Sequence, residues 1–120
     1  MRQLRYLLDE DTPHVICGQL LQREPDMEIL AVGDDMAPAL GTSDRELLQW
    51  IEQEGYVLVS RNRRTLPRHL HEHLEAGGHV PGIFLLRRRY SLGQIIEDLM
   101  LIWEAGNPEE YRDRVEYLPL

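Results

Sequence analysis

Short runs of β-forming residues alternate with segments of helical periodicity along the chain, and this alternation constrains the fold more than any other feature. Strands are expected at 5–8, 28–32, 56–60 and 82–86, with a last strand at 115–118. Helices are expected between them: one opening at Thr12 and Pro13, and others in "TSDRELLQWIEQEG", "LPRHLHEHLEAGG" and "SLGQIIEDLMLIWEAG". Such a pattern predicts a three-layer α/β/α sandwich with a mainly parallel sheet of four to five strands and right-handed crossovers.

Local signals set the ends of two of these helices. Ser43 and Glu46 have the spacing of a capping box, and Gly55 is placed to end the same helix. Ser91 and Gln94 repeat the capping-box spacing before the last long apolar stripe. We therefore expect one helix to begin after Ser43 and to end at Gly55, and another to begin after Ser91.

Size and composition predict one domain. A chain of 120 residues with 42% hydrophobic residues can bury a single core, so we expect one domain over 1–120. No apolar run approaches the roughly 20 residues that span a bilayer, and the start of the chain is not a secretory signal. A cytoplasmic protein without membrane contact is expected. Cys17, the one cysteine, is expected to be a buried structural thiol.

Charge is unevenly distributed along the chain. The formal net charge is -8, which argues against a protein that coats nucleic acid non-specifically. Residues 61–89, however, hold seven arginines and two glutamates, a balance of +5 that leaves -13 for the rest. All thirteen basic residues are Arg, whose guanidinium group suits bidentate phosphate contacts. Acidic and basic regions are thus segregated.

In open parallel sheets the ligand site lies beyond the carboxyl ends of the strands, where the strand order reverses. This rule gathers acids and basic residues that the sequence separates: Asp9, Glu10, Asp11, Asp34, Asp35, Asp44, Arg61, Asn62 and Arg63. Carboxylates brought close together repel one another unless a cation neutralises them, and hard oxygen ligands select Mg or Mn over zinc. Such a metal can activate water against a phosphodiester, so hydrolysis of nucleic acid is the function this pattern favours.

Each acid also has a purely structural interpretation. Asp11 or Thr12 can cap the helix that follows, and Asp44 lies in a first helical turn, where the helix dipole favours an anion. Both interpretations stay open at this point.

Arginines near the same edge are candidates for substrate binding. Arg61, Arg63 and Arg64 follow the third strand, and Arg87 and Arg88 follow the fourth, with the aromatic ring of Tyr90 available for stacking on a base. The alternative for the second group is a solvated loop. The apolar helix over 91–104 could in addition cover a partner subunit in a homodimer.

The chain resembles the PIN-like proteins of uncharacterised function, relatives of PIN-domain nucleases. In that family a first strand ends in "LLDE(N)xP", a helix opens with "SD.E" and a later strand ends in "(T/S)RD". This chain has "LLDEDTP" at 7–13, "TSDRELL" at 42–48 and "LVSRNRR" at 58–64, in the same order. The resemblance implies a PIN-like fold and, through Asp9, Asp44 and Glu10, a Mg or Mn site of ribonuclease type. It also implies a role as a toxin with an antitoxin-like protein partner.

One position departs from the family pattern. Where the family has an aspartate after the third strand, this chain has Asn62. An asparagine oxygen can coordinate Mg, but the missing charge weakens affinity for a divalent ion and removes a general base. Asn62 therefore joins Asp9, Glu10 and Asp44 as a catalytic candidate, and the alternative function is a degenerate PIN-like module that binds RNA or a protein partner.

Two rival interpretations have less support. His69 and His73 lie one turn apart on a helix, a spacing that can bind zinc, but no third ligand is evident. Acids after the first strand also occur in receiver-like phosphoacceptor domains. A chain without lysine cannot supply the lysine that this chemistry uses.

Overall fold

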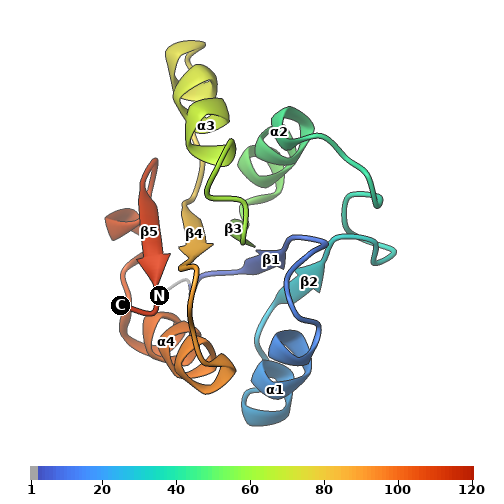
Figure 1. Cartoon of the computed structure of the whole chain (residues 1–120), viewed down its shortest axis with the longest axis vertical. Helices are drawn as coiled ribbons and strands as arrows, with labels where there is room; N and C mark the ends of the chain where they lie inside the picture. The colour runs from blue at the N-terminus through green and yellow to red at the C-terminus, as the bar shows by residue number, and fades with distance from the viewer. Residues whose placement is uncertain (1–2) are drawn as a thin grey trace.

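The computed structural model describes residues 3–120, and its strands form one sheet (Figure 1). All strand pairs are parallel, in the order β2-β1-β3-β4-β5, which confirms the predicted parallel sheet. The strands are β1 (Tyr6–Leu8), β2 (Ile29–Ala31), β3 (Val57–Ser60), β4 (Ile83–Leu86) and β5 (Val115–Leu118). The helices are α1 (Val15–Arg23), α2 (Asp44–Glu54), α3 (Leu66–Glu75), α4 (Leu92–Ala105) and the 3₁₀ turn η1 (Pro108–Glu110).

Helices cover both faces of the sheet, so the three-layer α/β/α sandwich is confirmed. Side chains of α1 and α4 form one apolar core with alternate strand residues such as Tyr6 and Phe84. Side chains of α2 and α3 form the second core with the residues between them, such as Leu7 and Leu58. Because successive strand side chains point to opposite faces, every central strand is buried on both sides.

The crossover through α4 has the opposite hand to the other three. The steps from β2 to β3, β3 to β4 and β4 to β5 run in one direction across the sheet, but α4 lies on the face opposite α2 and α3. The prediction of uniformly right-handed crossovers is therefore wrong for at least one connection. The reason is burial: α1 packs beside β2 and leaves Phe84 and Leu86 on the same face of the sheet for α4 to cover.

The predicted helix caps are present in α2 and α4. The side chains of Ser43 and Ser91 accept hydrogen bonds from the N–H groups of Glu46 and Gln94, respectively. Gly55 ends α2 with φ of 80°, a left-handed conformation that glycine adopts without steric cost.

The first helix begins later than predicted. Thr12 lies in a turn in which its backbone N–H and its hydroxyl both donate to the Asp9 carbonyl, at 3.1 and 2.6 Å. Thr12 is thus engaged before the helix starts, and α1 begins at Val15 without a side-chain cap. On α1, Cys17 is half-buried rather than fully buried, and burial raises the pKa of its thiol. None of the helices within 3–120 is both long and apolar enough to cross a membrane.

Candidate functional site

The strand order reverses between β1 and β3, and an open hollow lies at the carboxyl ends of these two strands. The chain steps from β1 to β2 on one side and then returns across β1 to β3. The hollow has a volume of about 580 Å³ and is called the acidic hollow below. Its lining residues are Asp9, Glu10, Asp11, Thr42, Asp44, Leu47, Arg61 and Asn62. The predicted edge of the sheet therefore brings together acids from two distant segments.

Asp9 is held in the acidic hollow by bonds to both of its carboxylate oxygens. Oδ1 accepts the Glu10 N–H at 2.8 Å, and Oδ2 accepts the hydroxyl of Ser60 at 2.8 Å. Burial raises the pKa of Asp9, its two hydrogen bonds lower it, and the charges of Asp11 and Asp44 raise it further. The net direction is upward, so the environment disfavours the ionised carboxylate in the absence of a cation.

Asp44 is the first residue of α2 and is bonded to the loop after β3. Its Oδ2 accepts the Asn62 Nδ2–H at 3.0 Å and the Thr65 hydroxyl at 3.2 Å. The amide oxygen of Asn62 accepts the Thr65 N–H at 3.2 Å. Asn62 thus presents its donor group to Asp44 and uses its oxygen in a local turn. A carboxylate at this position would face Asp44 directly.

Glu10 and Asp11 lie at the rim of the acidic hollow. Glu10 Oε1 accepts the Gly41 N–H at 3.0 Å, which connects the end of β1 to the loop before α2. Asp11 is exposed, and its backbone carbonyl accepts a bond from Arg61. Asp11 caps no helix, because α1 begins four residues later.

Asp34 and Asp35 do not join the acidic hollow, contrary to the expected gathering of all the acids. Asp34 Oδ2 accepts the Ala31 N–H at 2.8 Å, which closes a tight turn directly after β2. Asp35 is exposed in the same loop. The loop after β2 uses its own acid for its fold and reaches the hollow only further along, at Thr42.

The arginines after β3 are oriented by carbonyl groups. Arg61 lines the acidic hollow and donates to the Asp11 carbonyl at 3.3 Å. Arg63 donates to the carbonyl of Leu86, the last residue of β4, at 2.7 Å, and Arg64 is exposed. Carbonyl contacts leave a guanidinium group charged and able to bind a further anion.

The arginines after β4 lie outside the acidic hollow. Arg87 Nε donates to the Pro119 carbonyl at 2.8 Å, and its guanidinium carbon lies 5.7 Å from the centre of the Tyr117 ring. Arg88 is exposed. Tyr90 is half-buried and packs against the core of α1 and α4.

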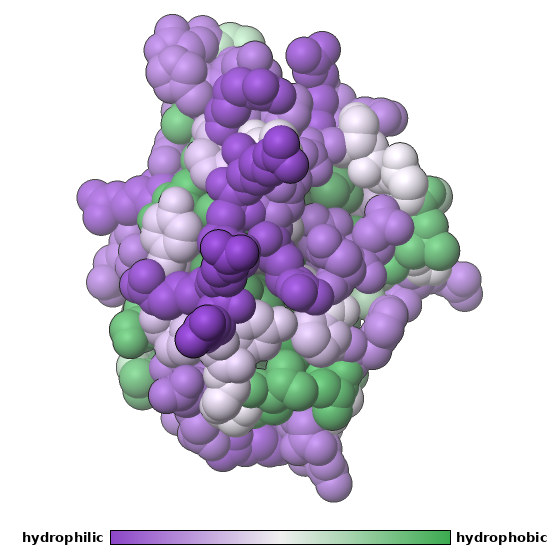
Figure 2. Space-filling view, viewed as in Figure 1, coloured by the Kyte–Doolittle hydropathy of each residue, from purple (hydrophilic) through white to green (hydrophobic). Residues whose placement is uncertain are grey.

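The arginines of 61–89 share one electrostatic property. Within residues 3–120, none of them forms an ion pair with a carboxylate; the paired arginines lie elsewhere, at 5, 23 and 112. Figure 2 shows a band of strongly hydrophilic side chains down the middle of the molecule, where the loops after β3 and β4 lie in Figure 1. A positively charged surface therefore borders the acidic hollow in a protein of net charge -8.

Two residues around the site, Ser60 and Thr65, were not predicted from the sequence, and a third, His69, was considered only as a zinc ligand. Ser60 is fully buried and bonds both Asp9 and the Asn62 N–H. Thr65 bonds Asp44, and His69 Nε2 lies 3.8 Å from the same carboxylate. A polar last residue in the otherwise apolar run "VLVS" was a signal for Ser60. The contacts of Thr65 and His69 had no comparable signal.

The two histidines proposed as a zinc pair have different partners. His69 lies between Asp44 and Glu72, at 3.8 and 3.4 Å, whereas His73 Nε2 contacts Glu52 at 2.6 Å. Among residues 3–120, no group of three or more His, Cys, Asp and Glu side chains is arranged to hold a metal ion.

The chemistry of the acidic hollow nevertheless suits magnesium better than zinc. Mg²⁺ is commonly bound by one or two carboxylates, with water and substrate phosphate completing its shell. Asp9 and Asp44 supply two carboxylates, and an amide oxygen of Asn62 is a further hard ligand if its side chain turns. The donor set of the hollow is therefore compatible with Mg or Mn.

The three motifs behind the PIN-like resemblance meet at this hollow. "LLDEDTP" supplies Asp9, "TSDRELL" supplies Asp44 and "LVSRNRR" supplies Asn62. No protein-family model, no curated protein and no solved structure gives a significant match to the chain.

Proposed function

We propose that this protein is a Mg- or Mn-dependent endoribonuclease of PIN-like type, with Asp9 and Asp44 as the metal ligands. The observation that carries the proposal is the convergence of these two carboxylates on one hollow at the point where the strand order reverses. Burial first, and then the charges of Asp11 and Asp44, raise the pKa of Asp9, as expected where a cation would stabilise the ionised carboxylate. The resemblance also supports a toxin role with an antitoxin-like partner.

The residues of the chain have distinct roles in this proposal. A bound Mg or Mn ion would supply Lewis-acid activation of the phosphate and of water. Ser60 and the Glu10 N–H orient the carboxylate of Asp9, and Thr65 orients that of Asp44. Arg61 lies beside the acids, where its guanidinium group can hold a substrate phosphate, and Arg63 and Arg64 extend the positive surface.

The test is cleavage of end-labelled single-stranded RNA with Mg or Mn, with EDTA as a control. Wild-type protein is compared with Asp9→Asn, Asp44→Asn and Asn62→Asp, and with Asp35→Asn as a matched charge change outside the hollow. The proposal is supported if the wild-type protein cleaves the RNA and if EDTA, Asp9→Asn and Asp44→Asn each abolish this cleavage. Asp35→Asn should cleave as wild type does. Cleavage that persists in Asp9→Asn would contradict it.

A second candidate function has its own observation. The Asn62 amide donates a hydrogen bond to Asp44, so this carboxylate has a partner without a metal. The aspartate that PIN-like proteins have at this position would instead repel Asp44. This contact favours a catalytically degenerate module that binds RNA or a protein partner through the same edge. Inactive wild-type protein with activity restored by Asn62→Asp supports this candidate, as does RNA binding without cleavage by all variants.

A further inference from the structure

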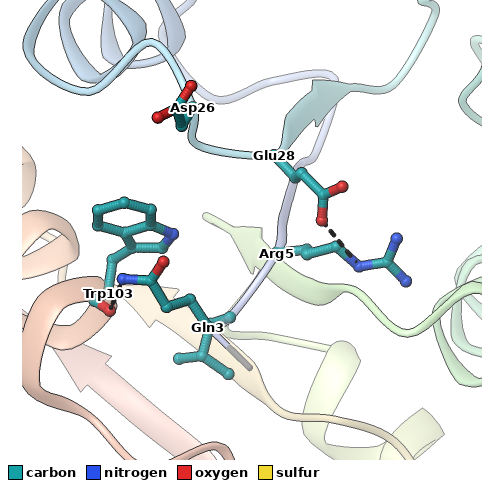
Figure 3. Close-up of a pocket in the computed structure, with 6 residues that line it drawn as sticks. Gln3, Arg5, Asp26, Glu28 and Trp103 are labelled. Carbon is teal, nitrogen blue, oxygen red and sulfur yellow. Dashed lines mark hydrogen bonds and ion pairs between the residues drawn. The ribbon is translucent and has the colours of Figure 1, made fainter. Parts of the chain in front are cut away.

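A second hollow lies at the opposite edge of the sheet from the acidic hollow (Figure 3). It has a volume of about 390 Å³ and is formed where the chain enters β1 and β2 and where α4 approaches its end. It is called the amino-edge hollow below, and its lining residues are Gln3, Leu4, Arg5, Asp26, Glu28 and Trp103. None of these residues takes part in the proposed nuclease site.

Trp103 gives the amino-edge hollow a hydrogen-bond donor. The residue is only 9% exposed, and its indole N–H has no hydrogen-bond partner among residues 3–120. This N–H is not among the fully buried atoms of these residues, so it is accessible from the hollow and can donate to a ligand. The Gln3 Nε2–H donates to the Trp103 carbonyl at 3.3 Å, which leaves the Gln3 side-chain oxygen as an acceptor nearby (Figure 3). A donor and an acceptor placed together complement the C=O and N–H groups of a peptide backbone.

The charge of the amino-edge hollow is negative, because two carboxylates, Asp26 and Glu28, line it against one arginine. Arg5 Nε lies 3.5 Å from Glu28 Oε2, its Nη2 donates to the Glu54 carbonyl, and its guanidinium carbon lies 4.4 Å from the centre of the Tyr56 ring. The carboxylate of Asp26 has no ion pair or hydrogen bond within 3–120. Asp26 lines the hollow, and Figure 3 shows it beyond the Trp103 ring, on the segment that leads into β2.

The hollow continues along the same edge of the sheet. An adjoining hollow of about 350 Å³ shares Gln3, Leu4 and Arg5 with it and adds the carboxylate of Glu109. The two hollows therefore meet at Gln3, Leu4 and Arg5, with Asp26 and Glu28 in one and Glu109 in the other. An extended chain segment fits two such adjoining hollows better than a compact ligand does.

We propose that the amino-edge hollow binds an extended segment of a partner protein that carries Arg or Lys side chains. A backbone carbonyl of the segment accepts the Trp103 N–H, and a backbone N–H donates to the Gln3 side-chain oxygen. Its basic side chains pair with Asp26 and, in the adjoining hollow, with Glu109. The backbone contacts supply position, and the carboxylates select for positive charge.

The test follows the indole N–H resonances of ¹⁵N-labelled full-length protein by NMR. The chain has two tryptophans, and Trp103→Phe assigns the two signals. The probe is an acetylated and amidated peptide, Gly-Arg-Gly-Arg-Gly, with Gly-Glu-Gly-Glu-Gly and arginine amide as comparisons. The expected result is a shift of the Trp103 signal by the basic peptide alone, with little change at Trp50.

Matched variants separate this site from general attraction to an acidic protein. Asp26→Asn should weaken peptide binding about two- to five-fold, the range of an exposed ion pair. Gln3→Ala should also weaken it, whereas Asp35→Asn, an equal change of charge in the loop after β2, should not. Equal losses in Asp26→Asn and Asp35→Asn would overturn the proposal. An unmoved Trp103 signal, or arginine amide binding as tightly as the peptide, would overturn it as well.

Discussion

The Asn62 amide donates a hydrogen bond of 3.0 Å to the carboxylate of Asp44, which joins the end of β3 to the start of α2. The same amide group also donates to the Thr65 hydroxyl at 2.8 Å. A neutral side chain therefore occupies the position from which a second carboxylate would repel Asp44. The stability of the protein should therefore change when the charge of residue 62 changes.

Replacement of Asn62 by aspartate should make stability depend on divalent metal. Two carboxylates about 3 Å apart repel each other by roughly 1 to 6 kcal/mol, depending on the effective dielectric constant. We expect the melting temperature of Asn62→Asp to lie below that of wild type in EDTA. Saturating Mg or Mn should raise it by more than it raises the melting temperature of wild type. Differential scanning calorimetry measures both effects.

Gln49→Glu is the control for Asn62→Asp, because it adds the same charge at an exposed position of α2. It should show no gain from Mg or Mn beyond that of wild type. An equal metal response in the two variants would exclude a specific effect at Asp44.

Loss of the Ser60 hydroxyl should destabilise the protein more than its small size suggests. The fully buried hydroxyl donates to Asp9 at 2.8 Å and accepts the Asn62 N–H at 3.0 Å. Ser60→Ala leaves that N–H without its acceptor, which should cost about 1 to 3 kcal/mol. Urea unfolding followed by circular dichroism measures the change. Thr42→Val, which removes a hydroxyl bonded to the Ala39 carbonyl in a surface turn, should cost less. Equal costs would contradict a special role for Ser60.

Local signals explain which helix ends could be predicted from the sequence. The caps at Ser43 and Ser91 and the left-handed Gly55 act within one turn of chain, so sequence spacing identifies them. The start of α1 was wrong because Thr12 bonds backward to Asp9 rather than forward into a helix. The predicted right-handed crossover was also wrong for α4. The hand of this connection depends on which face of the finished sheet remains uncovered.

The candidate site follows the same division. The convergence of Asp9, Asp44 and Asn62 could be predicted because the carboxyl ends of parallel strands share one edge. The exclusion of Asp34 could not, because it depends on a single side-chain bond to the Ala31 N–H. The bond between Ser60 and Asp9 likewise appears only when the register of β1 and β3 is known.

Replacement of Asp9 by asparagine should leave the protein at least as stable as wild type at neutral pH. Because burial and the neighbouring carboxylates raise the folded-state pKa of Asp9, the folded state binds this proton more tightly than the unfolded state does. Wild-type stability should therefore fall as pH rises from the ordinary carboxyl pKa through the raised pKa. Asp9→Asn should lack this fall in urea unfolding between pH 4 and 7. An unchanged pH profile would contradict the raised pKa.

The acid side of the pH profile should depend on Glu52 instead. Burial opposes ionisation of Glu52, but hydrogen bonds from the His79 N–H and His73, together with the charges of both histidines, outweigh it and lower the pKa. A lowered pKa contributes stability above the ordinary carboxyl pKa that is lost as pH falls through the folded-state value. Glu52→Gln should therefore flatten the loss of stability below about pH 4. Glu75→Gln, an exposed acid on α3, is the matched control and should keep the wild-type slope.

Replacement of Gly82 by alanine should be costly, because Gly82 sets the entry into β4. Its φ is 152°, and a Cβ atom there would lie 2.9 Å from the Tyr111 carbonyl oxygen, a backbone atom that cannot move alone. Its own carbonyl accepts the Leu58 N–H at 3.2 Å, so a shift would also disturb the pairing with β3. We expect Gly82→Ala to cost about 2 to 3 kcal/mol in urea unfolding. Gly77→Ala has a φ of 90° with open space around the new methyl group, so it should cost only about 1 kcal/mol. Similar losses in the two variants would mean that backbone strain alone, and not the contact with Tyr111, requires glycine at position 82.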